Sequence, residues 1–146
     1  MKGKHDMSKI AVVYWTSTGN TKAMAEAVAE GAKAAGAEVF LTTCEGFGAD
    51  KMDEYDAVAF GCPAMGAEEL EDGEFLPMFS ECEAKLSGKK TALFGSYGWG
   101  DGEWMRQWAE RARGDGAVLV AEGLIINDAP DDEGLEKCRA LGGMLA

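Results

Sequence analysis

The sequence has almost no histidine, because His5 is the only one among 146 residues. It lies in a polar stretch, residues 1–8, that we interpret as a flexible leader. A serine–histidine triad, an imidazole metal site and a phosphohistidine relay all need a histidine inside the folded domain, so we exclude them. The four cysteines, at positions 44, 62, 82 and 138, show no CxxC or other metal-ligand spacing. We therefore expect free thiols and no metal.

Basic residues and long apolar runs are also scarce. Lys and Arg number 14 against 26 Asp and Glu, a formal charge of −12, which argues against nucleic acid and anionic membranes and predicts basic-surfaced protein partners. No apolar run approaches the ~20 residues that span a bilayer, and no signal-peptide pattern opens the chain. We expect a cytoplasmic monomer with one domain, residues 9–146.

Short apolar segments alternate with helical patterns along the chain. The predicted strands cover 10–15, 38–42, 57–61, 91–95, and 117–121 with 124–126, the last broken or extended at Gly123. Helices are expected from Asn20 to Gly36, within 45–56, around 75–86, after an Asp101 cap, and from Pro130 onward. Almost continuously apolar strands separated by helices are typical of an α/β, doubly wound five-stranded parallel sheet with helices on both faces. We expect the order 2-1-3-4-5.

The stretch Thr16-Ser17-Thr18-Gly19-Asn20-Thr21 joins the first strand to the first helix. A helix start presents unpaired backbone N–H groups and the positive end of the dipole, and here hydroxyls and a glycine surround it. Because no Lys or Arg precedes Lys22, neutral donors would hold the anion, which suits a phosphate monoester. An ordinary turn with Ser/Thr capping explains this stretch equally well when it is taken alone.

Two further loops, 62–68 and 96–101, also follow predicted strands. With the order 2-1-3-4-5, all three loops surround one cleft at the carboxyl edge of the sheet, where ligands bind in such folds. Met65 and Trp99 offer apolar surfaces for the two faces of a planar ring. They could instead be core residues, but neighbouring Gly66, Gly98 and Gly100 disfavour that. The ligand indicated is a phosphate tail on an aromatic heterocycle.

Three motifs carry a resemblance to a known family. They are Tyr14-Trp15-Thr16-Ser17-Thr18-Gly19-Asn20-Thr21, Gly61-Cys62-Pro63-Ala64-Met65-Gly66, and Phe94-Gly95-Ser96-Tyr97-Gly98-Trp99-Gly100-Asp101-Gly102. In this order and at this spacing, from Ser8 onward, the chain resembles the short-chain flavodoxins, particularly those of clostridial type.

The resemblance implies one non-covalent FMN that cycles between quinone, semiquinone and hydroquinone. The protein would carry single electrons between redox proteins and turn over no substrate of its own. Met65 would cover the inner ring face and Trp99 the outer, Glu68 would accept from the flavin N3–H, and the Gly66 carbonyl would turn toward N5. The implied cofactor-binding set is Trp15, Thr16, Ser17, Thr18, Gly19, Asn20, Thr21, Pro63, Ala64, Met65, Gly66, Ala67, Glu68, Ser96, Tyr97, Gly98, Trp99 and Gly100.

Two positions depart from the clostridial pattern. Ser17 stands where glycine is frequent, and Ala67 occupies a turn position often filled by Asp, Ser or Gly, so the energetics of that turn stay open. From Glu68 to Glu83 the chain carries seven acids and no Lys or Arg. This predicts a negative electrostatic potential beside the ring and therefore a low reduction potential for the second electron. The alternative is that these acids form a solvated helix start, and for Glu71, Asp72 and Glu81 individually we favour that interpretation.

Two other functions compete with electron transfer. An FMN-dependent NAD(P)H quinone or nitro reductase would need a nicotinamide pocket, and the chain has no obvious insertion for one. A flavin-free domain of response-regulator type needs a phosphorylatable carboxylate at the end of the third strand, and Gly61-Cys62-Pro63 offers none.

Overall fold

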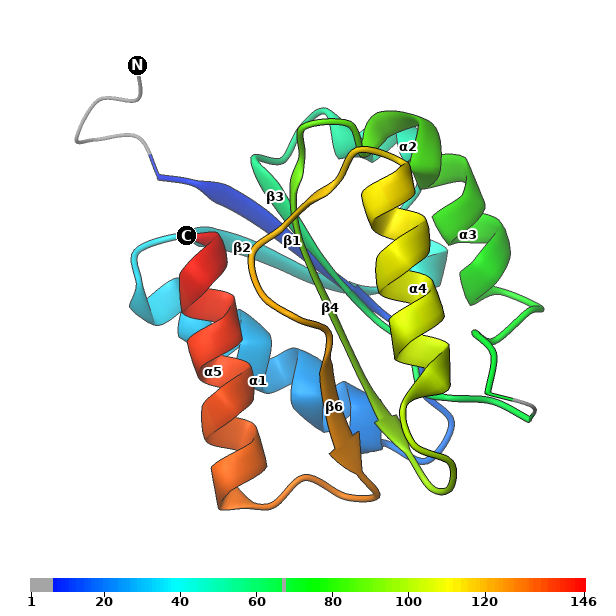
Figure 1. The fold of residues 1–146 in the computed structure, drawn as a ribbon. Helices are drawn as coiled ribbons and strands as arrows, with labels where there is room; N and C mark the ends of the chain where they lie inside the picture. The colour runs from blue at the N-terminus through cyan, green and yellow to red at the C-terminus, as the bar shows by residue number, and fades with distance from the viewer. Residues whose placement is uncertain (1–6, 67) are drawn as a thin grey trace.

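The computed structural model describes residues 7–66 and 68–146, which form one parallel sheet with helices on both faces (Figure 1). The order β2-β1-β3-β4-β5 confirms the predicted 2-1-3-4-5, and β6 pairs with β4 beyond β5. The strands are β1 (Lys9–Tyr14), β2 (Glu38–Thr43), β3 (Ala57–Gly61), β4 (Lys90–Tyr97), β5 (Val118–Leu119) and β6 (Leu124–Asn127). The α-helices are α1 (Asn20–Ala34), α2 (Ala49–Met52), α3 (Phe75–Cys82), α4 (Glu103–Gly114) and α5 (Asp132–Leu145). Short 3₁₀ turns occupy Cys44–Gly46 and Glu83–Lys85.

The strands are apolar on both faces because each face is covered. Val13 and Phe60 point into a core shared with α3 and α4, whereas Val12 and Ala59 point into a second core shared with α1 and α5. Figure 1 shows this division, with α1 and α5 on one side of the sheet and α3 and α4 on the other. Within the described residues, no helix is both long and apolar enough to cross a bilayer.

The fifth strand is divided as the sequence suggested. β5 pairs with the beginning of β4, with Val118 opposite Lys90, and β6 pairs with its end, with Leu124 opposite Phe94. This second pairing lengthens β4, because Ser96 and Tyr97 lie opposite residues of β6. The prediction that these two residues belong to a loop was therefore wrong.

Local signals predicted the start of α1 correctly, placed the start of α5 at Pro130 although the helix begins at Asp132, and misplaced the cap of α4. α1 begins at Asn20, and the Asp131 carboxylate caps α5 by accepting a hydrogen bond from Gly134 N–H at 2.8 Å. At α4, however, the cap position is Gly102 and not Asp101. Asp101 accepts from the Arg106 guanidinium at 3.0 Å instead.

Helices α1 and α5 lie against each other through glycines. A Cβ built on Gly31 would lie 1.9 Å from the Arg139 carbonyl oxygen, and one on Gly142 would lie 2.0 Å from that of Val28. Two backbones that close leave no space for a side chain, so the glycines allow this face of the sheet to be covered.

We predict that Gly31→Ala lowers the free energy of unfolding by roughly 1–3 kcal/mol, because the methyl group must push α5 away. Gly143→Ala is the matched control, since the nearest atom to its added Cβ is 4.0 Å away. That substitution should be neutral or stabilising, as alanine favours helix by roughly 0.5–1 kcal/mol. Equal urea midpoints for the two variants would contradict the close contact.

Candidate functional site

The three loops expected to converge do lie around one cavity, of about 180 Å³, at the carboxyl ends of β1, β3 and β4. Its walls carry Thr16, Ser17, Thr18, Asn20, Thr21, Pro63, Ala64, Met65, Ser96, Tyr97, Gly98 and Asp128. Of the other predicted site residues in the described chain, Gly19 lies within the first loop, Trp15 directly before it, Gly66 and Glu68 in the second, and Trp99 and Gly100 in the third.

The first loop leaves the start of α1 open for an anion. Gly19 adopts a left-handed φ of 97°, and its N–H donates to Thr16 Oγ1 at 3.0 Å. In the described chain no side chain caps α1 and no acid occupies its first turn. Thr21 is buried, and its Oγ1 accepts from Ser96 N–H at 3.4 Å, which leaves its hydroxyl hydrogen free to donate. The Thr16 hydroxyl thus holds the turn before the helix, as an ordinary Ser/Thr turn would, but the start of α1 itself receives no side-chain cap.

The second loop is held at its base and across its tip. Ala64 N–H donates to Ser96 O at 3.0 Å, and the Cys62 thiol accepts from Glu71 N–H at 3.4 Å. Two hydrogen bonds, of 2.8 and 3.0 Å, join Met65 and Glu69 across the turn. Burial raises the pKa of the Cys62 thiol to about 12, so it stays protonated.

The tip of this loop uses backbone conformations that are unusual for its residues. Gly66 has a φ of 44° and Glu68 a φ of 57°. A Cβ on Gly66 would meet no atom within 4 Å, so a side chain there would be disfavoured by φ and not by lack of space. The expectation for Ala67 lies outside the described residues.

The third loop exposes an aromatic ring. The Trp99 side chain is 65% exposed, so the alternative that it is a core residue is wrong, and Met65 is only half-buried. The core position belongs to Trp104, whose Nε1–H donates to Cys62 O at 3.2 Å. Both residues proposed to cover a ring are therefore available to a ligand.

The sequence reasoning missed Asp128, which lines the cavity from a fourth loop after β6. It has a φ of 57°, its N–H donates to Tyr97 O at 2.8 Å, and its carbonyl accepts from Ser96 Oγ at 2.8 Å. A signal was present, since Asn127-Asp128 directly follows the predicted strand 124–126 and both residue types tolerate left-handed backbone.

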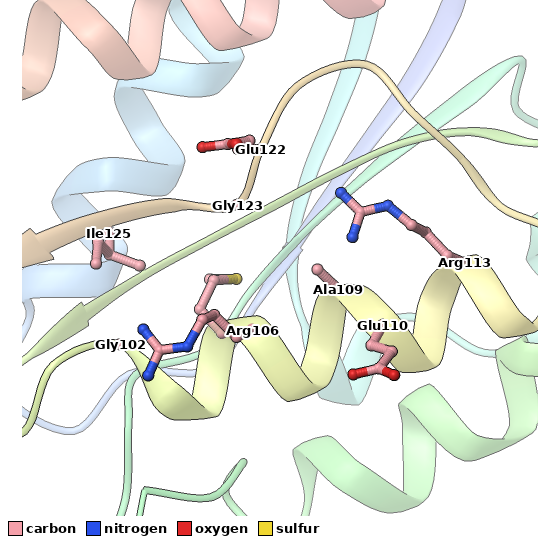
Figure 2. A pocket seen from close by; sticks show the side chains of 9 residues that line it. Gly102, Arg106, Ala109, Glu110, Arg113, Glu122, Gly123 and Ile125 are labelled. Atoms are coloured by element: carbon pink, nitrogen blue, oxygen red, sulfur yellow. The ribbon is translucent and has the colours of Figure 1, made fainter.

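At least four other cavities are larger, and two of them lie beside α4. One of about 530 Å³ separates α4 from the segment before β6, and Figure 2 shows Arg106 and Arg113 on α4 and Glu122 on that segment. None of the predicted site residues lines it. The other, of about 440 Å³, lies between residues 68–76 and α4. Size alone would therefore have selected a different place from the one where the loops converge.

The acidic segment proves to be partly structural. The Glu71 carboxylate accepts hydrogen bonds from the N–H groups of Gly73, Glu74 and Phe75 at 2.8, 2.8 and 2.7 Å, and so begins α3. Burial raises the Glu71 pKa, but these three donors outweigh it and lower the pKa below its ordinary value. The helix-start interpretation of Glu71 is confirmed.

Two other acids of this segment are also engaged. The Glu74 carboxylate accepts from Trp15 Nε1–H at 3.0 Å, which joins α3 to the first loop. Arg111 donates to Glu83 at 2.7 Å. The acidic segment has no basic residue of its own, but α4 supplies one. The expectation of uncompensated charge was therefore wrong for Glu83.

The sheet order and the converging loops define the class: a doubly wound α/β protein with its candidate site at the switch point between β1 and β3. Residues 12–142 match the family model described as Flavodoxin. The chain is 45% identical over 133 residues to a flavodoxin of Megasphaera elsdenii, covering 91% of this chain and 95% of that protein. It is likewise 45% identical over 135 residues to a flavodoxin of Clostridium beijerinckii, covering 92% and 97%.

The structural comparison agrees. The solution structure of two-electron reduced Megasphaera elsdenii flavodoxin superposes with a TM-score of 0.85 at 43% identity, covering 93% of this chain and 97% of that one. The chain belongs to the flavodoxin family, which confirms the resemblance. Flavodoxins are electron carriers whose cofactor is FMN.

We predict that Glu71→Ala lowers stability at pH 7 by roughly 0.5–2 kcal/mol, as expected for loss of a helix cap. Because the folded-state pKa is depressed, the wild-type contribution is present above the unfolded pKa and is lost as pH falls through the folded value. The difference between wild type and variant should therefore shrink on acidification. Glu81→Ala, at an exposed position nearby, is the control, and urea unfolding at a series of pH values is the measurement.

Proposed function

We propose that this protein is a low-potential one-electron carrier that holds FMN in the cavity between the loops after β1, β3 and β4. The observation that supports it most is that residues of all three loops line one cavity, with the hydroxyls of the first loop and Met65 on its walls. The exposed Trp99 directly follows Gly98, which lines the cavity from the third loop. The family supplies the cofactor, and the chain's own residues supply its environment.

The donor set fits a phosphate monoester. The start of α1 has backbone N–H groups with no side-chain cap in the described chain, and Thr16, Ser17, Thr18 and Thr21 add hydroxyls. Such donors stabilise a dianion through hydrogen bonds and the helix dipole, without a lysine or arginine. We assign these groups to the terminal phosphate of FMN.

The loops after β3 and β4 fit the ring. We assign Met65 and Trp99 to its two faces, Glu68 to its imide N–H, and the Gly66 peptide to its N5 edge. FMN supplies one-electron chemistry when bound. Stacked side chains exclude water from the ring, and an offset aromatic contact adds roughly 0.5–1.5 kcal/mol beyond its buried area.

The acids of this segment whose carboxylates make no hydrogen bond or ion pair in the described chain support a low reduction potential for the flavin and redox partners with basic surfaces. Glu69 and Asp72 are exposed beside Glu68, whereas Glu71 and Glu83 are engaged in bonds. A unit negative charge 4 Å from an added electron costs about 1 kcal/mol in water and more when desolvated. The same surface would attract redox proteins with positive surfaces, and a monomer suffices for this role.

The competing function is an FMN-dependent NAD(P)H quinone or nitro reductase. An absorption spectrum of the purified protein tests FMN binding, and addition of NAD(P)H with a quinone or nitro compound tests turnover. Flavin bands without turnover are the expected result, and steady NAD(P)H oxidation would favour the reductase.

We predict that FMN binds at least about a hundredfold more tightly than riboflavin, since two charge-assisted hydrogen bonds to phosphate contribute about 3 kcal/mol. Thr18→Val should weaken FMN binding and leave riboflavin binding unchanged. Fluorescence titration of the FMN-free protein measures both. Equal affinities for the two ligands would remove the phosphate role from the first loop.

We also predict that Trp99→Ala weakens FMN binding about three- to tenfold, through loss of stacking, and raises the potential of the second electron because water reaches the ring. Met144→Ala is the control, since this side chain is also exposed but lies on α5. Dithionite titration at fixed pH gives the potentials. Identical values for all three proteins would place Trp99 outside the site.

A further inference from the structure

Glu68 joins two loops that are far apart in the chain. Its backbone lies in the turn 65–69, but its carboxylate Oε1 accepts a hydrogen bond from Glu103 N–H at 3.1 Å. Glu103 is the first residue of α4. The contact therefore connects the loop after β3 to the helix after β4.

The start of α4 lacks a cap from its own segment. Gly102 occupies the cap position with a φ of 94° and has no side chain that could accept a hydrogen bond. A helix start nevertheless has unpaired N–H groups that favour a carboxylate. Glu68, 35 positions earlier in the chain, supplies the acceptor that Asp101 was expected to provide.

Gly100 makes room for this carboxylate. A Cβ on Gly100 would lie 2.5 Å from Glu68 Oε1 and 2.6 Å from its Cδ. The Glu68 carboxylate therefore packs directly on the backbone of the loop that carries Trp99. Any side chain at position 100 would displace it.

We propose that Glu68 is a positioning residue whose carboxylate fastens the turn 65–69 to the start of α4 and so sets the spacing between Met65 and Trp99 before a ring binds. The tie is the hydrogen bond from Glu103 N–H to Glu68 Oε1, and Oε2 is left for a donor on the ligand. The tie exists in the protein alone, and only its consequence for FMN affinity rests on the proposed function.

Amide hydrogen exchange of the FMN-free protein tests the tie directly. Glu68→Ala should speed exchange of the Glu103 amide about tenfold relative to the Trp108 amide inside α4, in line with the loss of a helix cap. Glu68→Gln, which keeps an acceptor oxygen, should restore most of the protection. Unchanged exchange at Glu103, or equal acceleration at both amides, would overturn the proposal.

A double-mutant cycle tests the role of Gly100. Gly100→Ala should lower the urea midpoint more than Gly36→Ala does, because both positions have similar positive φ values, 86° and 98°, but only Gly100 faces Glu68. In a Glu68→Ala background this excess should disappear, since no carboxylate remains to collide with. An excess that persists there contradicts the tie.

FMN affinity completes the test. Gly100→Ala should weaken FMN binding about tenfold relative to Gly36→Ala, although Met65, Glu68 and Trp99 are all retained. Equal FMN affinities of the two variants would overturn the positioning role. A wild-type protein that binds no FMN would refute the proposed function instead, and the exchange and urea measurements would still decide the tie.

Discussion

The candidate site depends on one constraint, which is that parallel strands end at the same edge of the sheet. β1 lies between β2 and β3, and the chain leaves β1 toward the α1 face but leaves β3 toward the α3 face. Two loops that depart in opposite directions open a crevice between them. The loops after β4 and β6 close its far side, and Asp128 enters the cavity in this way.

Loops rich in glycine and serine need ties to hold a fixed shape, and here carboxylates provide many of them. Glu71 begins α3, Glu74 holds Trp15, and Glu68 begins α4. Glu71 accepts from N–H groups of the turn that follows it, whereas Glu74 and Glu68 accept from donors far away in the chain. The acidic character of the chain therefore contributes to the architecture of the site as well as to its electrostatic potential.

Because some of these carboxylates hold loops and helix starts, fewer of them act as free negative charges beside the site. Glu83 is neutralised by Arg111, and Glu71 is held by three N–H groups, so neither acts as a free charge. Glu69 and Asp72 remain exposed, and under the proposed function they are the charges that would oppose an added electron at the ring and attract basic partners. The two effects follow from the same charges and should weaken together at high salt.

The sequence by itself determined the α/β class, the positions of the strands, the division at Gly123 and the three site loops, because burial, periodicity and turn chemistry act over a few neighbouring residues. The strand order joins distant segments, and the expected order 2-1-3-4-5 needed the tertiary structure to confirm it. It did not predict that Glu68 reaches Glu103, that Arg111 reaches Glu83, or that Asp128 lines the cavity. The expected Asp101 cap was wrong for the same reason, since a distant carboxylate took the place beside Gly102. These contacts join residues about 30 positions apart, and only the packing of helices and loops around the finished sheet decides which side chains meet.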